Sequence, residues 1–547
     1  MNKITMQPPV GSGLPIRTIE SANDTLTLTG VAHATYDVTL EVDGIVQDSF
    51  SLAINADTVR NINVAVAGQT TRFSVVGLSS TFSGVGDGIA DNFNPLKNYV
   101  LATVANPLTL SIPEGNYYLK GPDNGRVEAW PSKSKGIELL GNGGTLYPVN
   151  NRTSNKHEHY VMQLDFAEGN QGAYVQDILI DGSRNNGGNI LGLFDINPDP
   201  FGENNVVSSQ IPLQRGIYVT GAKELIHKDN TYKDMYGGYT LMVSGTPKVI
   251  SENNIYDGVG GNNWTENFGM AFYVGGTAGD TVVDINNDKA QGLISPTDAS
   301  KMSWIGFVLE NGTVQVADRT QWRVDKNTHI NITDTDYLDF ETGYHLETQA
   351  GNVYLNIWGG HVRVKNYMVA SGIKGECRVR VYDQVIDFIP NKRGDFFIQG
   401  LLYTENEEAK NNAGLNSFEF YNCTLNYPSA LNKDGTKFNP ALSYADNSHV
   451  KLYNCTLNNV PDRLVQNASA TLVDCEINLA EGNTRTTLEQ IKGDMSKPAE
   501  QAVVLTRTNI NPHGAWQNAV AGAEPIKVKN TGYVAPELLE PIGPAGL

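Results

Sequence analysis

Acidic and aromatic residues gather at the ends of two similar β-rich segments of the chain. Asp234 and Asp257 end successive copies of one repeat, and the stretch after Asp257 adds Trp264 and Glu266. Hydrolysis of a glycosidic bond requires two carboxyl groups roughly 5 to 9.5 Å apart, beside aromatic surfaces on which sugar rings stack. We therefore expect one of Asp257 and Glu266 to act as the acid and the other as the base or nucleophile. Asp234 would position one of these two side chains or shift its pKa.

Further residues near these acids could hold a sugar. Tyr236 and Trp264 would line a saccharide groove, and Trp322 and Arg319 are additional candidates for substrate binding, the arginine because a guanidinium can clamp an anionic sugar. Asp234 and Asp257 could equally be Asx-turn residues that close coils of the chain. The sequence leaves both interpretations open.

A second acidic cluster lies between residues 332 and 349 and is the second choice for the site. Strand alternation along this segment would put Tyr337, Asp339, Glu341, His345 and Glu347 on one face, which we expect to point outward. The three acids of this face are therefore the alternative catalytic candidates. Such a face could also be a solvated sheet surface or a rim between subunits.

The segments that position these residues are repeats. Two copies, residues 216–234 and 240–258, share five identities at a fixed offset of 24 residues: Val219, Gly221, Ile226, Asn230 and Tyr232 recur as Val243, Gly245, Ile250, Asn254 and Tyr256. Each copy consists of short β-branched or aromatic runs separated by Gly or Asx turn residues, without helical periodicity. A unit of this length closes a circuit of roughly 80 Å, one turn of a parallel β-helix, in which Asn230 would stack on Asn254.

The same pattern returns near the C-terminus and includes three of the four cysteines. The segments FEFYNCTLN, VKLYNCTLN and TLVDCEIN place Cys423, Cys455 and Cys475 at the ladder position that asparagine holds earlier. Their wide spacing differs from the short paired spacings of zinc sites. We expect buried, unpaired thiols on one internal line.

Composition limits the classes of partner. The 547 residues carry a formal net charge of −19 at pH 7, which argues against a nucleic-acid partner because no basic stripe is available to neutralise phosphates. The sequence contains no apolar run of membrane-spanning length and no secretion signal. We therefore expect that the chain does not insert into a membrane and that it assembles in a cytoplasm. No phosphate loop, zincin or EF-hand motif occurs, and we expect no metal and no cofactor.

The pattern changes along the chain define four segments. Residues 1–22 are punctuated by Pro and Gly and are expected to be extended, whereas residues 23–80 alternate with period 2 as a small β-sandwich. On the runs TLTLTGV and VTLEVDG this part resembles Ig-like modules of adhesins and phage structural proteins, which implies attachment or spacing. Residues 81–488 would be the β-helix and residues 489–547 C-terminal coils and a tail.

A short helix is expected at the start of the β-helix. Asn94 can cap it with Pro95 at its first position, and Leu96, Tyr99 and Val100 would form its apolar face.

This entrance carries a Gly-Asp-Gly turn, an acid, the helix and a Pro-x-Gly-x-Tyr turn, at Gly86, Asp87, Gly88, Asp91, Pro113, Gly115 and Tyr117. It resembles the entrance of the pectate-lyase-like β-helix of bacteriophage tailspikes, although Asn92-Phe93 stands where an acid and a Thr are usual. The resemblance implies an all-β, right-handed parallel β-helix that assembles as a homotrimer. The Gly-Asp-Gly turn is structural in that family, so Asp87 is not a catalytic candidate.

The resemblance and the acidic aromatic segments together lead to a functional hypothesis. We expect a tailspike in the virion tail, made in the host cytoplasm, joined to other tail proteins through its N-terminal region, that binds and hydrolyses a bacterial capsule or O-antigen. A non-catalytic adhesin with the same groove is the alternative. A lyase is less favoured, because pectate lyases rely on calcium and a basic residue that nothing here matches.

Overall fold

The structure is a computed structural model of the 547-residue chain. It describes residues 2–8, 16–21, 25–31, 34–54, 59–66, 69–77, 82–120, 133–149, 159–182, 214–235, 239–259, 270–275, 279–294, 302–311, 327–348, 351–373, 375–389, 396–397, 400–404, 416–428, 437–438, 442, 449–460, 464, 469–481, 504–511, 514–515 and 527–528. The chain divides into two compact units, Met1–Gly187 with Gly216–Lys233, and Gly188–Arg215 with Asp234–Leu547.

Seven strands form two small sheets at the N-terminus of the first unit. One sheet has the order β2 (Arg17–Ser21), β1 (Asn2–Gln7), β4 (Ala34–Val42), β5 (Ile45–Ile54), and the other has the order β3 (Thr25–Val31), β7 (Gln69–Gly77), β6 (Val59–Val66). Residues 2–7 and 17–21 are strands that pair within this sheet, so these described parts of the expected N-terminal segment belong to the module. The alternation of Ile4 and Met6, both fully buried, explains why β1 joins it.

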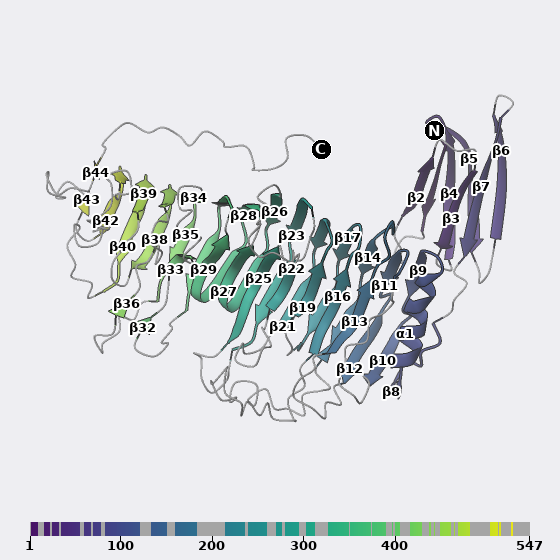
Figure 1. The fold of residues 1–547 in the computed structure, drawn as a ribbon, viewed down its shortest axis with the longest axis horizontal. Coiled ribbons are helices and arrows are strands. Elements are labelled where there is room, and N and C mark those ends of the chain that lie inside the picture. The colour runs from purple at the N-terminus through teal and green to yellow at the C-terminus, as the bar shows by residue number, and fades with distance from the viewer. Residues whose placement is uncertain are drawn as a thin grey trace, which may run out of the picture. The chain divides into compact units, whose positions relative to one another are not determined.

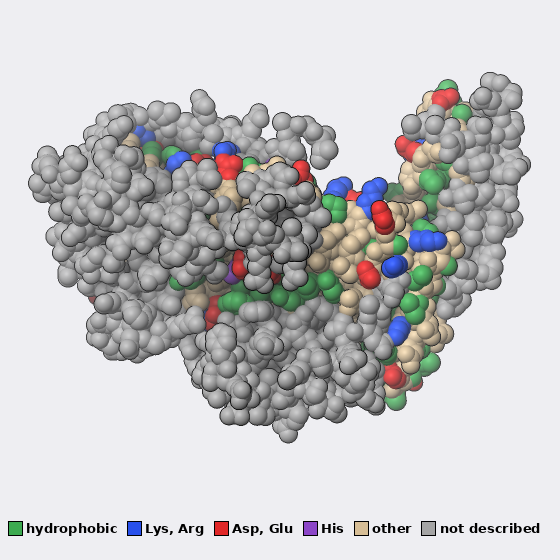
Figure 2. Space-filling view, in the orientation of Figure 1, with side chains coloured by type: hydrophobic (Ala, Val, Ile, Leu, Met, Phe, Trp, Pro, Cys, Tyr) green, Lys and Arg blue, Asp and Glu red, His purple; other side chains and the backbone are tan. Residues whose placement is uncertain are grey.

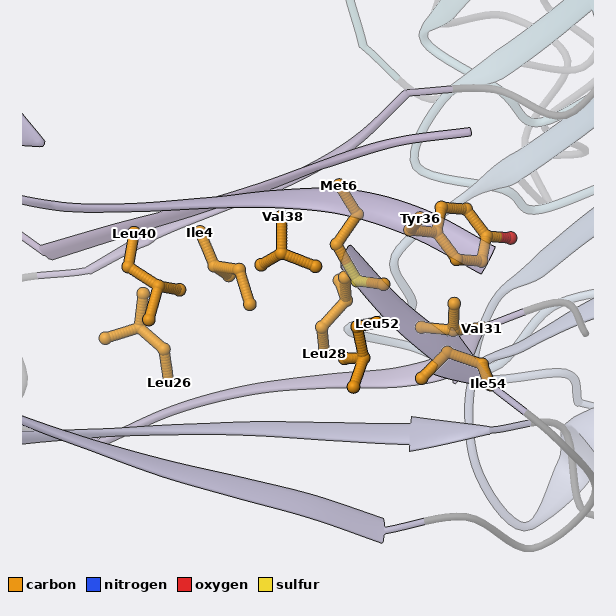
Figure 3. Close-up of a cluster of buried hydrophobic side chains, with 10 residues drawn as sticks. All are labelled: Ile4, Met6, Leu26, Leu28, Val31, Tyr36, Val38, Leu40, Leu52 and Ile54. Carbon is orange, nitrogen blue, oxygen red and sulfur yellow. The ribbon is translucent and has the colours of Figure 1, made fainter. Parts of the chain in front are cut away.

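The core of this module comes from both sheets. Figure 3 shows Ile4, Val38 and Leu40 facing Leu26, and the cluster continues through the other labelled residues, including Tyr36, Leu28 and Leu52. Period-2 burial in β1 and in the second half of β5 is what a strand with one face on a core requires. The module is thus a two-layer β structure with its own core.

The expected helix is present as α1 (Phe93–Leu101), followed by a 3-10 turn over Ala102–Val104. Its buried residues are Leu96, Tyr99 and Val100, as the apolar spacing predicted. The start differs, because the cap position is Asn92, whose side chain bonds Val85 and Ala90 instead of the helix backbone. Pro95 therefore lies within the first turn.

Parallel strands form the coils of the first unit. One row has the order β9 (Leu108–Ser111), β11 (Ile137–Leu140), β14 (Ala173–Gln176), β17 (Leu225–Lys228). The other row contains β8 (Asp87–Asp91), β10 (Gly115–Lys120), β12 (Gly144–Val149), β13 (His159–Asp165), β15 (Leu179–Asp181), β16 (Gln214–Thr220) and β18 (Thr231–Lys233). The Oδ1 atom of Asp87 accepts the N–H groups of Ile89 and Ala90, which is the structural role expected for this turn.

The second unit contains two long parallel walls, whose strands lie side by side in Figure 1. The first wall has the order β20 (Lys248–Glu252), β23 (Thr281–Asn286), β26 (Asn327–Thr333), β28 (Asn352–Trp358), β30 (Cys377–Tyr382), β34 (Asn416–Tyr421), β37 (His449–Tyr453), β39 (Ser469–Val473), β41 (Val504–Thr506), β44 (Lys527–Val528).

The second wall consists of two stacks that share the long strands β27 (Asp336–Thr348) and β29 (His361–Ile373). One stack contains β19 (Tyr239–Ser244), β22 (Met270–Gly275), β25 (Ser303–Asn311), the C-terminal parts of β27 and β29, and β33 (Gly400–Thr404). The other stack contains β21 (Ile255–Val259), β24 (Lys289–Gly292), the N-terminal parts of β27 and β29, β31 (Val385–Phe388), β35 (Thr424–Asn426), β38 (Thr456–Val460), β40 (Glu476–Leu479) and β42 (Asn509–Asn511), with which β43 (Gly514–Ala515) pairs antiparallel. A short pair, β32 (Phe396–Phe397) and β36 (Lys437–Phe438), is separate. β41 and β42 continue the two walls past residue 488, in the segment for which further C-terminal coils are expected.

In-register stacking lines up like residues inside the coils, as a parallel β-helix requires. Along the first wall the buried residues form one apolar ladder of Val249, Val283, Ile330, Leu355, Val379, Phe418, Val450 and Ala470. The fold class read from the repeats is confirmed, an all-β chain with parallel β-helix coils.

Each coil of the second unit turns from the first wall to the second through a left-handed residue. These residues are Asn253, Asn287, Asp334, Gly359, Asp383, Asn422, Asn454, Asp474 and Arg507, with φ between 44° and 64°. Asn and Asp tolerate this conformation better than other residues with a side chain, which is why the repeats carry them here.

The residue after this turn points inward. Cys423, Cys455 and Cys475 occupy it in successive coils, are buried and unpaired by disulfides, and Cys455 lies in contact with both others. The predicted thiol line is confirmed. Asn254 and Asp288 hold the same position earlier, and both are fully buried.

Candidate functional site

The backbones of Asp234 and Asp257 meet, as their positions in the repeat indicated. The N–H of Asp234 donates to the carbonyl of Asp257 over 2.8 Å, and Asp257 is exposed at the middle of β21. Asp234 adopts φ 51°, the conformation of an Asx turn residue. A Cβ at Gly258 would lie 3.2 Å from the Oδ1 atom of Asp234, so this glycine leaves room for the Asp234 carboxylate.

The remaining residues of the first-choice site lie outside the described residues. These are Glu266, Trp264, Tyr236, Arg319 and Trp322. Their grouping around Asp257 and Asp234 stays a prediction.

Two of the three second-choice acids are held in ion pairs. Asp339, which is 5% exposed, accepts hydrogen bonds from Arg363 and from Gln291. Glu341 accepts a hydrogen bond from Lys365 over 2.6 Å. Both carboxylates are therefore engaged with side chains of neighbouring strands.

The outward face of this segment differs from simple alternation. Tyr337 is 1% exposed and points into the core, so its predicted outward position is wrong. The cause is Asp339, whose φ of 65° coincides with a register irregularity between β27 and β29 and reverses the alternation.

The third acid, Glu347, has a glutamate as its neighbour. Glu347 of β27 is the register partner of Glu310 of β25, and the flanking partners in this row are Gly275 and Gly372. Residues in register on parallel strands are about 4.8 Å apart and point to the same face. Since Leu309 and Leu346 are both fully buried, the two glutamates point outward.

Glu310 is positioned by Tyr273. The Tyr273 hydroxyl donates to Oε2 of Glu310 over 2.9 Å. A Cβ at Gly275 would lie 2.6 Å from this hydroxyl and 2.5 Å from the carbonyl of Glu310. Only glycine at 275 therefore lets the tyrosine ring reach the carboxylate from the neighbouring strand.

Glu347 is paired with His345. The Nε2 atom of His345 lies 3.3 Å from Oε2 of Glu347, and it donates because an ionised carboxylate can only accept. This hydrogen bond lowers the pKa of Glu347 below its ordinary value, so the group stays ionised. His345 is 8% exposed and its ring packs against Trp304 with a centroid distance of 6.2 Å.

An apolar cluster lies beside the two glutamates. It contains Met270, Tyr273, Ile305 and Val308, with Tyr239, Met242 and Trp304 partly buried against it. Figure 2 shows hydrophobic side chains gathered on the visible face with acidic and histidine side chains at their edge. Two outward glutamates on adjacent strands beside partly buried aromatic rings are the residue types that cleavage of a glycosidic bond requires.

Sequence reasoning missed Glu310, Tyr273 and Trp304. The signal was present, because the runs FYVG, FVLE and YHLE place residues 275, 310 and 347 at one repeat position. Aligning these three runs with one another brings the two glutamates to one position.

Within the described ranges, no group of three or more His, Cys, Asp or Glu residues could hold a metal ion. No helix among those residues is long and apolar enough to span a membrane.

Comparisons with known proteins assign the chain to no family. No protein-family model and no curated protein matches the chain. Among solved structures it is similar to the Streptococcus pneumoniae surface protein and adhesin PfbA, with a TM-score of 0.41 and 13% identity over 82% of this chain and 94% of that chain. A second crystal structure of PfbA gives a TM-score of 0.36 and 12% identity over 72% and 87%.

Proposed function

We propose that the chain binds a bacterial surface polysaccharide on the second wall and hydrolyses it with Glu310 and Glu347. The observation that carries the proposal is their direct register pairing on adjacent strands. A strand spacing of about 4.8 Å between their Cα atoms lets two outward glutamate side chains bring their carboxyl groups to the 5 to 5.5 Å found in retaining glycosidases.

The contacts of the two glutamates assign their roles. Glu347, held ionised by His345, is the nucleophile that attacks the anomeric carbon, while Glu310 protonates the departing glycosidic oxygen. The glycosyl ester on Glu347 is then cleaved by water, from which Glu310 takes the proton. Two displacements retain the anomeric configuration.

The apolar cluster supplies the binding surface. Trp304 and Tyr239 are only partly buried beside the glutamates, and such rings offer stacking area to a pyranose. Remote contacts of this kind position the scissile bond over the acids.

The proposal includes a place for the protein. A tailspike would be a homotrimer in the virion tail, assembled in the host cytoplasm and joined to other tail proteins by the two-sheet N-terminal module. The Gly-Asp-Gly entrance and the helix at Phe93–Leu101 support this resemblance. A monomeric mass measured by light scattering at micromolar concentration would contradict the proposed homotrimer.

The experiment is digestion of purified capsule and O-antigen polysaccharides, followed by sizing of the products. We expect wild-type protein to release oligosaccharides whose first-formed anomer, read by proton NMR, keeps the configuration of the polymer. Glu310→Gln should bind the polymer without shortening it. Glu376→Gln is the matched control, because Glu376 accepts a hydrogen bond from Tyr354 at 2.8 Å but lies next to β30 in the first wall.

Other outcomes separate the alternatives. Polymer binding without shortening by wild-type protein would leave a non-catalytic adhesin. Full activity of Glu310→Gln together with loss of activity in Asp257→Asn or Glu266→Gln would place the active site at Asp257 and Glu266 instead.

A further inference from the structure

A histidine and an aspartate form a partly exposed pair in the stack of the second wall that contains β31 and β35. The Nε2 atom of His361 lies 2.8 Å from Oδ2 of Asp387, and each side chain is 33% exposed. Val362 and Ile386 are register partners and are fully buried, so the residues on either side of them point outward. The pair is therefore open to a ligand from outside the coils.

The contact with Asp387 fixes the position of the proton on His361. An ionised carboxylate can only accept a hydrogen bond, so Nε2 of the neutral imidazole carries the proton and Nδ1 keeps its lone pair. The backbone N–H of His361 donates to Oδ1 of Asp336 over 2.9 Å, which anchors the residue on the neighbouring strand. Among the described residues, none forms a hydrogen bond with Nδ1 of His361. The imidazole is held in the tautomer that a general base needs.

A ladder of asparagines holds Asp387 from the opposite side. Asn426 donates from Nδ2 to Oδ1 of Asp387 over 2.7 Å, and its own Oδ1 accepts from Asn458 over 2.8 Å. Asn478 and Asn511 extend the chain with two further bonds of 2.9 Å. Because the carboxylate at the end cannot donate, every amide in the chain turns its NH₂ group toward it, and bonds aligned in this way strengthen one another. Asp387 is thus fixed on both sides.

A guanidinium lies on the same outward face as the pair. Arg363 follows His361 by two residues on β29 and is the register partner of Asp387. Its Nε and Nη2 atoms donate to Asp339, whereas its Nη1 group forms no hydrogen bond to any residue that the structure describes. Alternate residues of a strand are about 6.6 Å apart and point to the same face. An ester group can therefore contact the imidazole and the guanidinium together.

These contacts lead to a second activity. We propose that His361 is the general base of a second active site, which hydrolyses acyl esters such as O-acetyl groups on a polysaccharide. An imidazole oriented by a carboxylate, beside a cation that stabilises negative charge on oxygen, is the arrangement that acyl transfer to water requires. The ester chemistry is independent of the proposed glycosidase, and only the choice of a polysaccharide ester rests on that function.

The reaction needs no reactant besides water. The Nδ1 atom of His361 takes a proton from a water molecule while the water oxygen forms a bond to the ester carbonyl carbon. The electron pair of the C=O π bond moves to the oxygen, where the Arg363 guanidinium stabilises the negative charge. When the carbonyl re-forms, the C–O bond to the sugar breaks, and the departing sugar oxygen takes the proton from Nδ1. The products are acetic acid and a free hydroxyl group.

The test uses the full chain with two probes, 4-nitrophenyl acetate and purified O-acetylated capsule and O-antigen polysaccharides. Free acetate is measured by proton NMR. We expect wild-type protein to release acetate from both probes and His361→Gln to release it about 100-fold more slowly or less. Asp383→Asn is the matched control and should keep the wild-type rate, because Asp383 precedes the same strand and accepts from Asn422 over 3.0 Å without contacting His361.

A second variant tests the positioning role of Asp387. In Asp387→Asn the amide can donate to Nε2, so the proton of His361 moves to Nδ1 and the lone pair is lost from the reacting side. We expect kcat to fall with KM unchanged, and ¹⁵N NMR of the imidazole to show the changed tautomer. A wild-type kcat in this variant would overturn the role of Asp387.

The outcomes separate this site from the proposed glycosidase. Absence of acetate release from both probes, or a wild-type rate in His361→Gln, would overturn the second site. Release from 4-nitrophenyl acetate but from no polysaccharide would overturn the substrate class. Acetate release without shortening of any polymer would refute the glycosidase proposal and support the esterase.

Discussion

The two walls of the second unit share the same stacking geometry but carry different side chains on their outer faces. On the outer side of the first wall, Trp358, Tyr382, Tyr421 and Tyr453 stack ring on ring, with interplanar angles of 7° to 10°. Beside them Glu419 is bound by Arg380 and Lys451. On the second wall, Glu310 accepts a hydrogen bond from a tyrosine and Glu347 one from a histidine.

This difference separates stability from chemistry. Stacked rings and a neutralised acid lower the free energy of the folded state, whereas two adjacent acids that pair with no lysine or arginine of the described strands raise it. Strained or uncompensated groups are retained where they serve a function. Variants of matched glutamates on the two walls should therefore respond in opposite ways.

The largest effect is expected at the second wall. Glu347→Gln removes the nucleophile, and turnover should fall about 10³-fold or more while the midpoint of thermal unfolding hardly changes. Product formation over time is the measurement. A wild-type rate in this variant would show that Glu347 is not the nucleophile.

Between the walls, the buried ladder residue Asp288 should make stability depend on pH. Burial raises its pKa to about 7, although Ser251 and Asn254 donate hydrogen bonds to it. Since the folded form keeps a proton that the unfolded form loses near pH 3.8, stability falls as pH rises from there to about 7.

Asp288→Asn removes this titration. Its free energy of unfolding, relative to wild type, should rise by about 2 to 3 kcal/mol between about pH 5 and pH 8, measured by denaturant unfolding. An equal difference at both pH values would show that the carboxyl does not titrate in the folded protein.

The matched change on the first wall is Glu419→Gln. Burial would raise the pKa of Glu419, but hydrogen bonds from Lys451, Ser417 and Tyr421 lower it, so the ionised form stabilises the fold. The variant leaves Arg380 and Lys451 without their acid and should lose about 2 kcal/mol of stability with unchanged turnover. Loss of turnover at unchanged stability would reverse the assignment of the walls.

The smallest effect concerns the acid limb of the pH profile. His345 lowers the pKa of Glu347, so activity should persist below the pH at which an ordinary glutamate becomes protonated. In His345→Ala this limb should shift to higher pH, since the hydrogen bond that favours ionisation is lost. The rate measured against pH decides the point, and an unshifted limb would show that Glu347 is not the group titrating.

The repeats allowed the coils to be predicted because stacking demands like residues at a fixed spacing. The line of Cys423, Cys455 and Cys475 followed from spacing alone. Tyr337 was predicted to point outward, but the left-handed conformation of Asp339 reverses the alternation of the strand. An aspartate in the sequence does not by itself predict this conformation. Glu310 was missed because it is partnered by register with a strand more than 30 residues away in sequence, not by local pattern.

The left-handed turns also make the coils interchangeable modules. The junctions at Asn422-Cys423 and Asn454-Cys455 have the same sequence on both sides, Tyr-Asn-Cys-Thr, and the same turn geometry. Excising residues 423–454 would join Asn422 directly to Cys455 and restore this motif. The shortened chain would lose one rung from each wall without shifting the register of any other, so the length of this protein can be edited in whole coils.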